Sequence, residues 1–147
     1  MGRNPEFIVF NTQKQVRRKG REAFDKVQKS ICVICLSKDV APTFWAVDES
    51  LKKARKEGIA FRLIIEKPVS EKTFSEVIPQ YNGLIEAKYL PSLPPVHLSF
   101  YDNTEVFIRT RTESNNGKFL VLWSNNSILM IIVRNYFELM WNAAKEK

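Results

Sequence analysis

The chain has 147 residues, of which 44% are hydrophobic and 27% are charged. This composition is typical of one globular domain and excludes disordered and fibrous proteins. A chain of this length buries about two thirds of its unfolded surface, so its core needs neither a metal nor a disulfide. No apolar run approaches the roughly 20 residues that a membrane-spanning helix requires.

The 23 basic and 16 acidic residues give a net charge of +7. Residues 14–29 carry seven of the basic side chains and only two acidic ones. Such a segment attracts nucleic acid, an anionic membrane or an acidic partner, but it is also typical of the solvated face of a helix. Charge alone therefore assigns no function.

The N-terminus shows no apolar signal-peptide pattern, and Cys32 and Cys35 lie within an apolar stretch. Unpaired cysteines are typical of a reducing compartment, so we expect a cytoplasmic protein. Residues 1–7 lack periodicity and end in Glu-Phe, a pair that a cloning site commonly leaves, so they are interpreted as an expression remnant. We expect one domain over residues 8–147, taken from a longer protein.

The first half of the chain predicts a parallel βαβ unit. A helix at residues 12–29 precedes a short β-branched strand at residues 31–37, which suits a position buried on both faces of a mostly parallel sheet. A helix at residues 42–57, with Pro42 in its first turn, leads to a second buried strand at residues 59–66. The crossover between two such strands is expected to be right-handed.

The second half predicts a short helix at residues 71–81, a strand at 84–89 and a hairpin of strands at 96–101 and 105–112. The hairpin turn is Asp102-Asn103-Thr104, and a further apolar strand follows at residues 119–123. These elements complete a sheet of both parallel and antiparallel strands.

A long final helix follows the capping run at residues 124–127 and reaches about residue 144. Its predicted buried face consists of Leu129, Ile132, Val133, Tyr136, Phe137, Met140 and Trp141. Ile128, Ile131 and Leu139 lie off that face, so the helix is apolar around more than half of its circumference. We expect the extra apolar surface to serve a partner chain, which favours a homodimer.

Several kinds of chemistry are excluded by what the sequence lacks. There is one histidine, and the Cys32-x-x-Cys35 pair has no second pair to complete a zinc site. None of the five glycines has the spacing of a phosphate-binding loop. We therefore expect no cofactor and no nucleotide hydrolysis.

The order of the elements places His97 in the hairpin, Trp123-Ser124-Asn125-Asn126 after the last strand and Tyr-Phe-Glu-Leu-Met-Trp at residues 136–141. Over residues 11–141 this arrangement resembles the degenerate phospholipase D-like domains of archaeal regulators. These domains occur in TrmB-type transcription factors and as sensory modules beside archaeal histidine kinases. The resemblance implies an α/β fold, a phospholipase D-like sandwich whose mostly parallel or mixed sheet is flanked by helices and followed by a long C-terminal helix.

Active phospholipase D-like enzymes use a His-x-Lys pair, a downstream Asp and a Gly-Ser-x-Asn turn to cleave phosphodiesters. The His attacks phosphorus, and the Lys and Asn hold the phosphate oxygens. This chain matches the His at His97, but Ser99 stands at the Lys position, Asp102 is a turn residue and the Gly-Ser-x-Asn stretch falls on residues 109–112. Without the lysine, the resemblance implies a site that has lost catalysis.

A site that has lost catalysis can still bind a ligand. Arg109 and Arg111 share one face of their strand, and with His97 and Ser99 they form a candidate pocket for a carboxylate or phosphate. The alternative is that both arginines face solvent.

The leading interpretation is a non-catalytic sensory or regulatory domain that binds a small anion, dimerises or does both, and signals to a DNA-binding or kinase domain elsewhere in the parent chain. A dimeric phosphodiesterase or nuclease of the same superfamily is the alternative. Direct nucleic-acid binding is not expected, because the sequence shows no helix-turn-helix or aromatic RNA-binding signature.

Overall fold

A computed structural model describes all residues of the chain except 1–3, 68, 93–95, 111–117 and 147. The strands are β1 (Phe7–Phe10), β2 (Ser30–Leu36), β3 (Ala60–Glu66), β4 (Ile85–Leu90), β5 (Val96–Tyr101), β6 (Glu105–Thr110) and β7 (Val121–Ser124). The helices are α1 (Gln13–Lys26), α2 (Ser37–Ala46), α3 (Asp48–Lys56), the π-helical turn η1 (Thr73–Val77), α4 (Ile78–Gln80) and α5 (Ser127–Ala143). No helix of this described part has the length and apolarity needed to cross a membrane.

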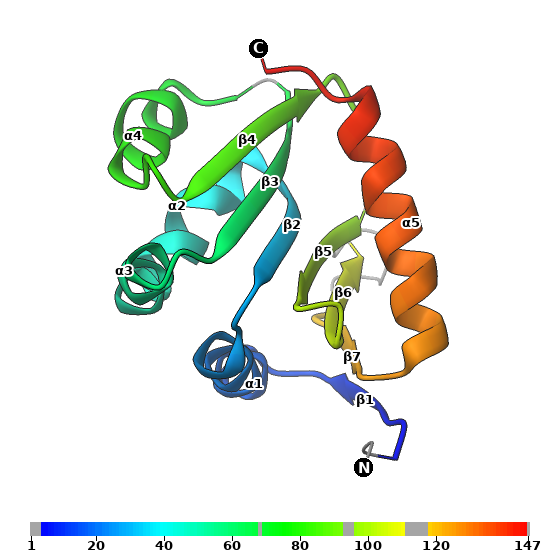
Figure 1. Cartoon of the computed structure of the whole chain (residues 1–147). Helices are drawn as coiled ribbons and strands as arrows, with labels where there is room; N and C mark the ends of the chain where they lie inside the picture. Colours follow the sequence, from blue (N-terminus) through cyan, green and yellow to red (C-terminus); the bar gives the residue numbers. More distant parts are fainter. Residues whose placement is uncertain (1–3, 68, 93–95, 111–117, 147) are drawn as a thin grey trace.

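The strands form one seven-stranded sheet in the order β1-β7-β6-β5-β2-β3-β4. β2, β3 and β4 are parallel, and all other neighbouring strands pair antiparallel. The helices α1 to α4 cover one face of this sheet and α5 covers the other (Figure 1). The α/β sandwich, its mixed sheet and its long last helix are thereby confirmed, with the parallel strands limited to β2, β3 and β4.

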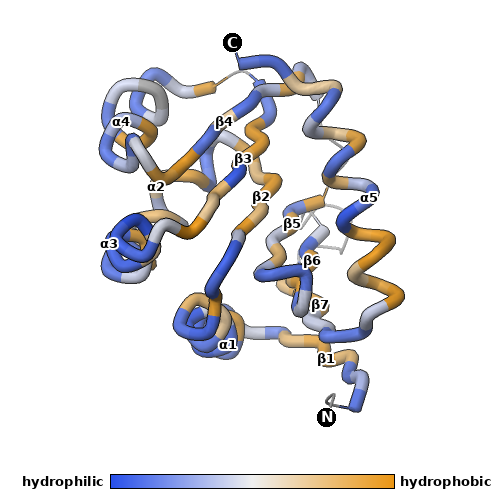
Figure 2. Tube along the Cα trace, in the orientation of Figure 1, coloured by the Kyte–Doolittle hydropathy of each residue, from blue (hydrophilic) through white to orange (hydrophobic). Residues whose placement is uncertain are grey.

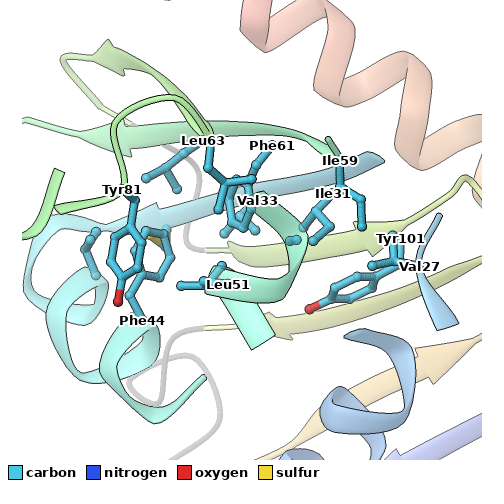
Figure 3. Close-up of a cluster of buried hydrophobic side chains, with 14 of the residues drawn as sticks. Val27, Ile31, Val33, Phe44, Leu51, Ile59, Phe61, Leu63, Tyr81 and Tyr101 are labelled. Carbon is cyan, nitrogen blue, oxygen red and sulfur yellow. The ribbon is translucent and has the colours of Figure 1, made fainter. Parts of the chain in front are cut away.

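The central strand β2 contributes to the cores on both faces of the sheet. Residues 31–35 are all buried, with Ile31, Val33 and Cys35 packed in the core under α1 to α4, while Cys32 and Ile34 pack in the core under α5. Figure 3 shows the first of these cores, and Figure 2 shows the hydrophobic colour of β2 along its length. The continuous apolar run at residues 31–36 is explained by this two-sided burial.

The predicted helix at residues 42–57 is wrong in its start and its continuity. Helix α2 begins directly after β2, so Pro42 lies inside it rather than in its first turn. At Val47 the backbone leaves helical geometry, with φ −119° and ψ 23°, and α3 begins at the next residue. This break lets Leu51 of α3 reach the same core as Phe44 of α2.

Residues 6 and 7, interpreted from the sequence as part of an expression remnant, lie in and against the sheet. Phe7 is the first residue of β1 and pairs with Ser124 of β7. The Ser124 hydroxyl donates to the carbonyl oxygen of Glu6 at 2.6 Å, and the Glu6 N–H donates to Asn125 Oδ1 at 2.7 Å. No periodicity in the sequence predicts a strand at these residues.

Helix α5 is confirmed, but its buried face is rotated from the predicted one. The buried residues are Met130, Val133, Phe137 and Trp141. Ile132, predicted to be buried, is 60% exposed, because a stripe centred on Val133 and Phe137 turns position 132 away from the sheet. The outer side of α5 is therefore more apolar than the sequence analysis predicted.

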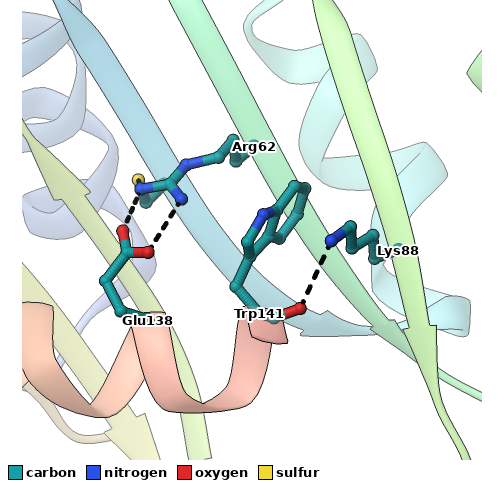
Figure 4. Close-up of polar contacts among 5 residues, drawn as sticks. Arg62, Lys88, Glu138 and Trp141 are labelled. Atoms are coloured by element: carbon teal, nitrogen blue, oxygen red, sulfur yellow. Dashed lines mark hydrogen bonds and ion pairs between the residues drawn. The ribbon is translucent and has the colours of Figure 1, made fainter. Parts of the chain in front are cut away.

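Polar contacts fasten α5 to the parallel half of the sheet (Figure 4). Arg62 of β3 donates through both terminal nitrogens to the carboxylate of Glu138, and its guanidinium lies 5.0 Å from the ring centre of Phe137. The Arg62 hydrogen bonds hold the pKa of the Glu138 carboxyl below its usual value. The Lys88 ammonium of β4 donates to the Trp141 carbonyl oxygen at 3.5 Å, so α5 runs from the end of β7 to β4.

The predicted hairpin of β5 and β6 is confirmed, and its turn is tied to the start of β2. Asp102 and Asn103 have φ values of 54° and 56°, and the Thr104 N–H donates to the Tyr101 carbonyl oxygen at 2.9 Å, so they are the central residues of a tight turn with two positive φ values. The Asp102 carboxylate accepts hydrogen bonds from the backbone N–H groups of Gln28, Lys29 and Ser30 at 2.8, 2.7 and 3.0 Å.

We predict that Asp102→Ala lowers the free energy of unfolding by about 1 to 2 kcal/mol, because three backbone donors lose their charged acceptor and only some regain water. Urea unfolding followed by circular dichroism measures the change. Asn103→Gly is the matched control, since glycine adopts positive φ without cost. Equal stability of Asp102→Ala and the wild type would contradict this role.

Candidate functional site

A cavity of about 610 Å³ lies on the face of the sheet that α1 to α4 cover. Strands β2, β3, β5, β6 and β7 line it from the sheet, and α1, α2 and α3 line it from the helical layer. Its apolar lining includes Phe24, Val33, Phe44, Val47, Leu51, Phe61, Phe107 and Val121. Several of these side chains appear together in Figure 3. This volume lies within the range of pockets that hold small organic ligands.

The polar part of the lining centres on Arg109 of β6. His97 of β5 is its direct cross-strand partner, and Arg109 Nη2 lies 3.1 Å from His97 Nδ1. A guanidinium can only donate, so Nδ1 accepts and the imidazole proton lies on Nε2. Asp39 of α2 approaches the same Nη2 atom at 3.7 Å, and the ring centre of Phe119 lies 5.8 Å from the guanidinium.

This environment keeps His97 neutral. Burial and the neighbouring Arg109 charge lower the pKa of His97 to about 4, while Asp39 partly opposes the shift. Burial raises the pKa of the nearby Cys35 thiol, so this group is uncharged as well. The local charges are therefore Arg109 and Asp39, with no contribution from the imidazole at neutral pH.

Helix α1 adds two more cations to the cavity. Arg17 and Arg21, one turn apart, both line it, and Gly20 lies between them. Helix α1 is held by buried Ala23 and by Lys19, whose ammonium lies 4.0 Å from the ring centre of Trp123. Three arginines against one aspartate give the cavity a positive balance.

The structure brings three of the four predicted site residues together. His97, Ser99 and Arg109 all line this cavity, and Arg111 lies outside the described residues. Burial raises the pKa of Tyr101 to about 12, and a hydrogen bond with Ser99 partly opposes this rise. Ser99 is thus engaged with the tyrosine two residues along the strand.

Sequence reasoning missed Asp39, Arg17, Arg21 and Gly20 as parts of the site. One signal was available for Asp39, which lies three residues past the carboxyl end of a parallel strand, where α/β sheets commonly bind ligands. The spacing of Arg17 and Arg21 put them on one face of α1, but nothing in the sequence said that this face overlies the hairpin. Among the residues that the structure describes, no three His, Cys, Asp or Glu side chains are grouped as a metal site.

Three solved structures are similar over nearly the whole chain. TrmBL2, an archaeal chromatin protein, matches with a TM-score of 0.75 and 16% identity over 96% of this chain and 54% of TrmBL2. Nuc of Salmonella typhimurium, a phospholipase D family member, matches with a TM-score of 0.71 and 17% identity over 97% of both chains. NucT from Helicobacter pylori matches with a TM-score of 0.70 and 12% identity over 97% of this chain and 99% of NucT.

This chain thus spans about half of TrmBL2 and nearly all of the two Nuc proteins. No family sequence model matches it, and no curated protein is similar to it in sequence. At these identities the similarity shows the fold. The chain has a phospholipase D-like fold, related to that of the archaeal TrmBL2 protein.

Proposed function

We propose that the chain is a non-catalytic sensory or regulatory domain that binds a small organic anion in the cavity between the sheet and α1. The observation that carries this proposal is Arg109, which His97 and Asp39 orient toward a cavity that Arg17 and Arg21 also line. An oriented guanidinium matches the geometry of a carboxylate or phosphate. The apolar lining suits a ligand that carries an apolar body beside its anionic group.

Loss of catalysis is part of the proposal. Ser99 stands where the resemblance places a lysine, and a hydroxyl does not supply the charge that stabilises a phosphoryl transition state. The Nδ1 atom of His97 faces Arg109 at 3.1 Å, so the guanidinium positions the imidazole rather than activating it as a base would.

The similarity to an archaeal chromatin protein supports a regulatory role. TrmBL2 is described as binding DNA, and the chain spans about half of that protein. We propose a cytoplasmic homodimer whose ligand state is read by a DNA-binding or kinase domain of the parent chain, with no direct nucleic-acid contact by this domain.

We predict that an anionic ligand stabilises the wild type, and that this effect depends on the cavity arginines. Thermal shift assays with inorganic phosphate, benzoate, phenyl phosphate, a hexose phosphate and a nucleoside monophosphate test it at fixed salt. A ligand at about 100 times its Kd adds about 2.7 kcal/mol to stability. Arg17→Gln/Arg21→Gln is expected to weaken binding at least tenfold.

The matched control is Lys14→Gln/Arg18→Gln, which removes the same charge from the same helix at positions outside the cavity lining. Gly20→Leu is a second probe, because a Cβ at Gly20 meets nothing within 4 Å and leucine favours the helix. This variant should keep or raise the Tm and abolish binding. The proposal would be refuted if none of the tested anions stabilises the wild type. Equal losses of ligand affinity in both double variants would refute it as well.

The single histidine allows a direct measurement of the site. We predict that NMR titration of His97 gives a pKa of about 4 without ligand, and that a bound anion beside Arg109 raises this pKa. Because the unfolded chain takes up a proton near its ordinary pKa while the folded chain does not, the free energy of unfolding falls as the pH drops from about 6.5 toward 4. The free energy of unfolding of His97→Gln should fall less over this pH range. Titration of His97 near pH 6.5 in the folded protein would contradict the described site.

The alternative function is a phosphodiesterase or nuclease. It is favoured by the similarity to Nuc, a phospholipase D family member, and by a cation, Arg109, within 3.1 Å of His97. Hydrolysis of bis(p-nitrophenyl) phosphate in the presence of EDTA separates the two functions. Turnover that His97→Ala abolishes would favour the enzyme, and its absence in the wild type would favour the sensory domain.

A further inference from the structure

The outer side of α5 is an exposed apolar surface. Ile128, Ile131, Ile132 and Leu139 of this helix are between 47% and 65% exposed. Figure 2 shows hydrophobic colour along much of α5, including its first turns. Isolated exposed apolar residues are ordinary, but four on one helix form a patch of the kind that marks an interface.

The same side of the sheet leaves two strands with exposed apolar residues. Ile8 and Phe10 of β1 pack in the core under α1, so alternation directs Phe7 and Val9 to the α5 side, where they are 60% and 63% exposed. In register with Val9, the half-buried Leu122 of β7 faces the same way. A sheet of seven strands is roughly 29 Å wide and a helix about 10 Å, so one helix does not fill this layer.

The sequence of α5 places a second seam beside the buried one. Ile128, Ile132, Asn135, Leu139 and Asn142 are all exposed and follow each other at intervals of four and three residues. This is the heptad spacing by which two helices pack along each other. One seam of α5 thus packs on its own sheet, and the other is available for a helix that lies alongside.

We propose that this seam binds the α5 helix of a second copy of the chain, antiparallel and around a two-fold axis near Asn135. Ile132 and Leu139 lie on either side of Asn135, so the middle of the seam matches itself when reversed, as a two-fold interface requires, and Ile128 of one helix lies opposite Asn142 of the other. Helix α5 has only two charged residues, Arg134 and Glu138, and Glu138 is paired with Arg62 of the same chain. An uncharged surface with this symmetry fits a second copy better than a partner of opposite charge.

An amide at a heptad position supports this occupant. The seam holds two amides, Asn135 at its centre and Asn142 at its end. An Asn in an otherwise apolar seam costs stability but specifies register, because its amide is satisfied only when it meets another polar group. In the antiparallel pair, Asn135 meets its symmetry equivalent near the axis. The inference deepens the homodimer of the proposed function and does not depend on the ligand.

Sedimentation equilibrium of the whole chain between about 1 and 100 μM, which detects a dimer with a dissociation constant on the order of micromolar, tests the interface. The wild type is expected to dimerise, and the Ile132→Lys/Leu139→Lys variant is expected to remain monomeric. At a concentration where both proteins are monomeric, their Tm values should be equal. Trp45→Lys is the matched control, because Trp45 is an exposed apolar residue of α2 on the opposite face. A monomeric wild type, or a dimer that the α5 variant leaves intact, would overturn the inference.

Cysteine cross-linking tests the orientation. Both native cysteines are buried, so a single introduced thiol dominates the reaction. Asn135→Cys should form an intermolecular disulfide readily, because the axis brings position 135 of the two copies together. Asn142→Cys should not, because an antiparallel pair places position 142 of one copy far from position 142 of the other. Equal cross-linking of both variants would indicate a parallel pair and overturn the two-fold arrangement.

Ligand binding and oligomeric state, measured on the same proteins, separate this inference from the proposed function. A monomeric wild type that binds an anion would refute only the dimer. A dimer retained by the α5 variant would keep the homodimer of the proposed function and refute its assignment to α5.

Discussion

The carboxylate of Asp102 joins the two halves of the sheet. This carboxylate accepts three backbone hydrogen bonds from the segment that leads into β2. The backbone N–H of Asp102 donates to the Ser30 carbonyl oxygen at 2.9 Å. The antiparallel hairpin is thereby aligned with the parallel unit, with Ile31 opposite Tyr101. A slip of one residue would turn His97 and Ser99 toward α5, so the composition of the cavity depends on this junction.

Two arginines on opposite faces of the sheet show how a charge is either used for structure or left for a ligand. The Arg62 guanidinium donates to both oxygens of Glu138 and lies against the rings of Phe137 and Trp141, so its role is to hold α5. Arg109 meets a neutral imidazole and one carboxylate at 3.7 Å. Its positive charge is less fully compensated, and it faces a cavity rather than a helix.

Local patterns in the sequence predicted the elements that local physics determines. The buried strands β2 and β3, the hairpin and the helix α5 followed from apolar runs and turn residues, and the predicted pocket already grouped His97 with Arg109. The break at Val47, the short edge strand β1 and the rotation of α5 were not predictable, because each is decided by packing against distant residues. The place of Asp39 after the carboxyl end of β2 was a general signal for a ligand site, but its contact with Arg109 joins α2 to β6 and was not predictable from the local sequence.

The two buried cysteines give the fold an internal reporter in each of its layers. Cys32 packs in the core under α5 and Cys35 in the core under α1 to α4, and burial raises the pKa of both thiols. A thiol reagent reaches either one only when its own layer opens. The rates at which the two cysteines are labelled therefore measure, without any engineered probe, whether the helices on one face can detach while the opposite face stays closed. The same rates show which layer a bound ligand or a second chain holds closed.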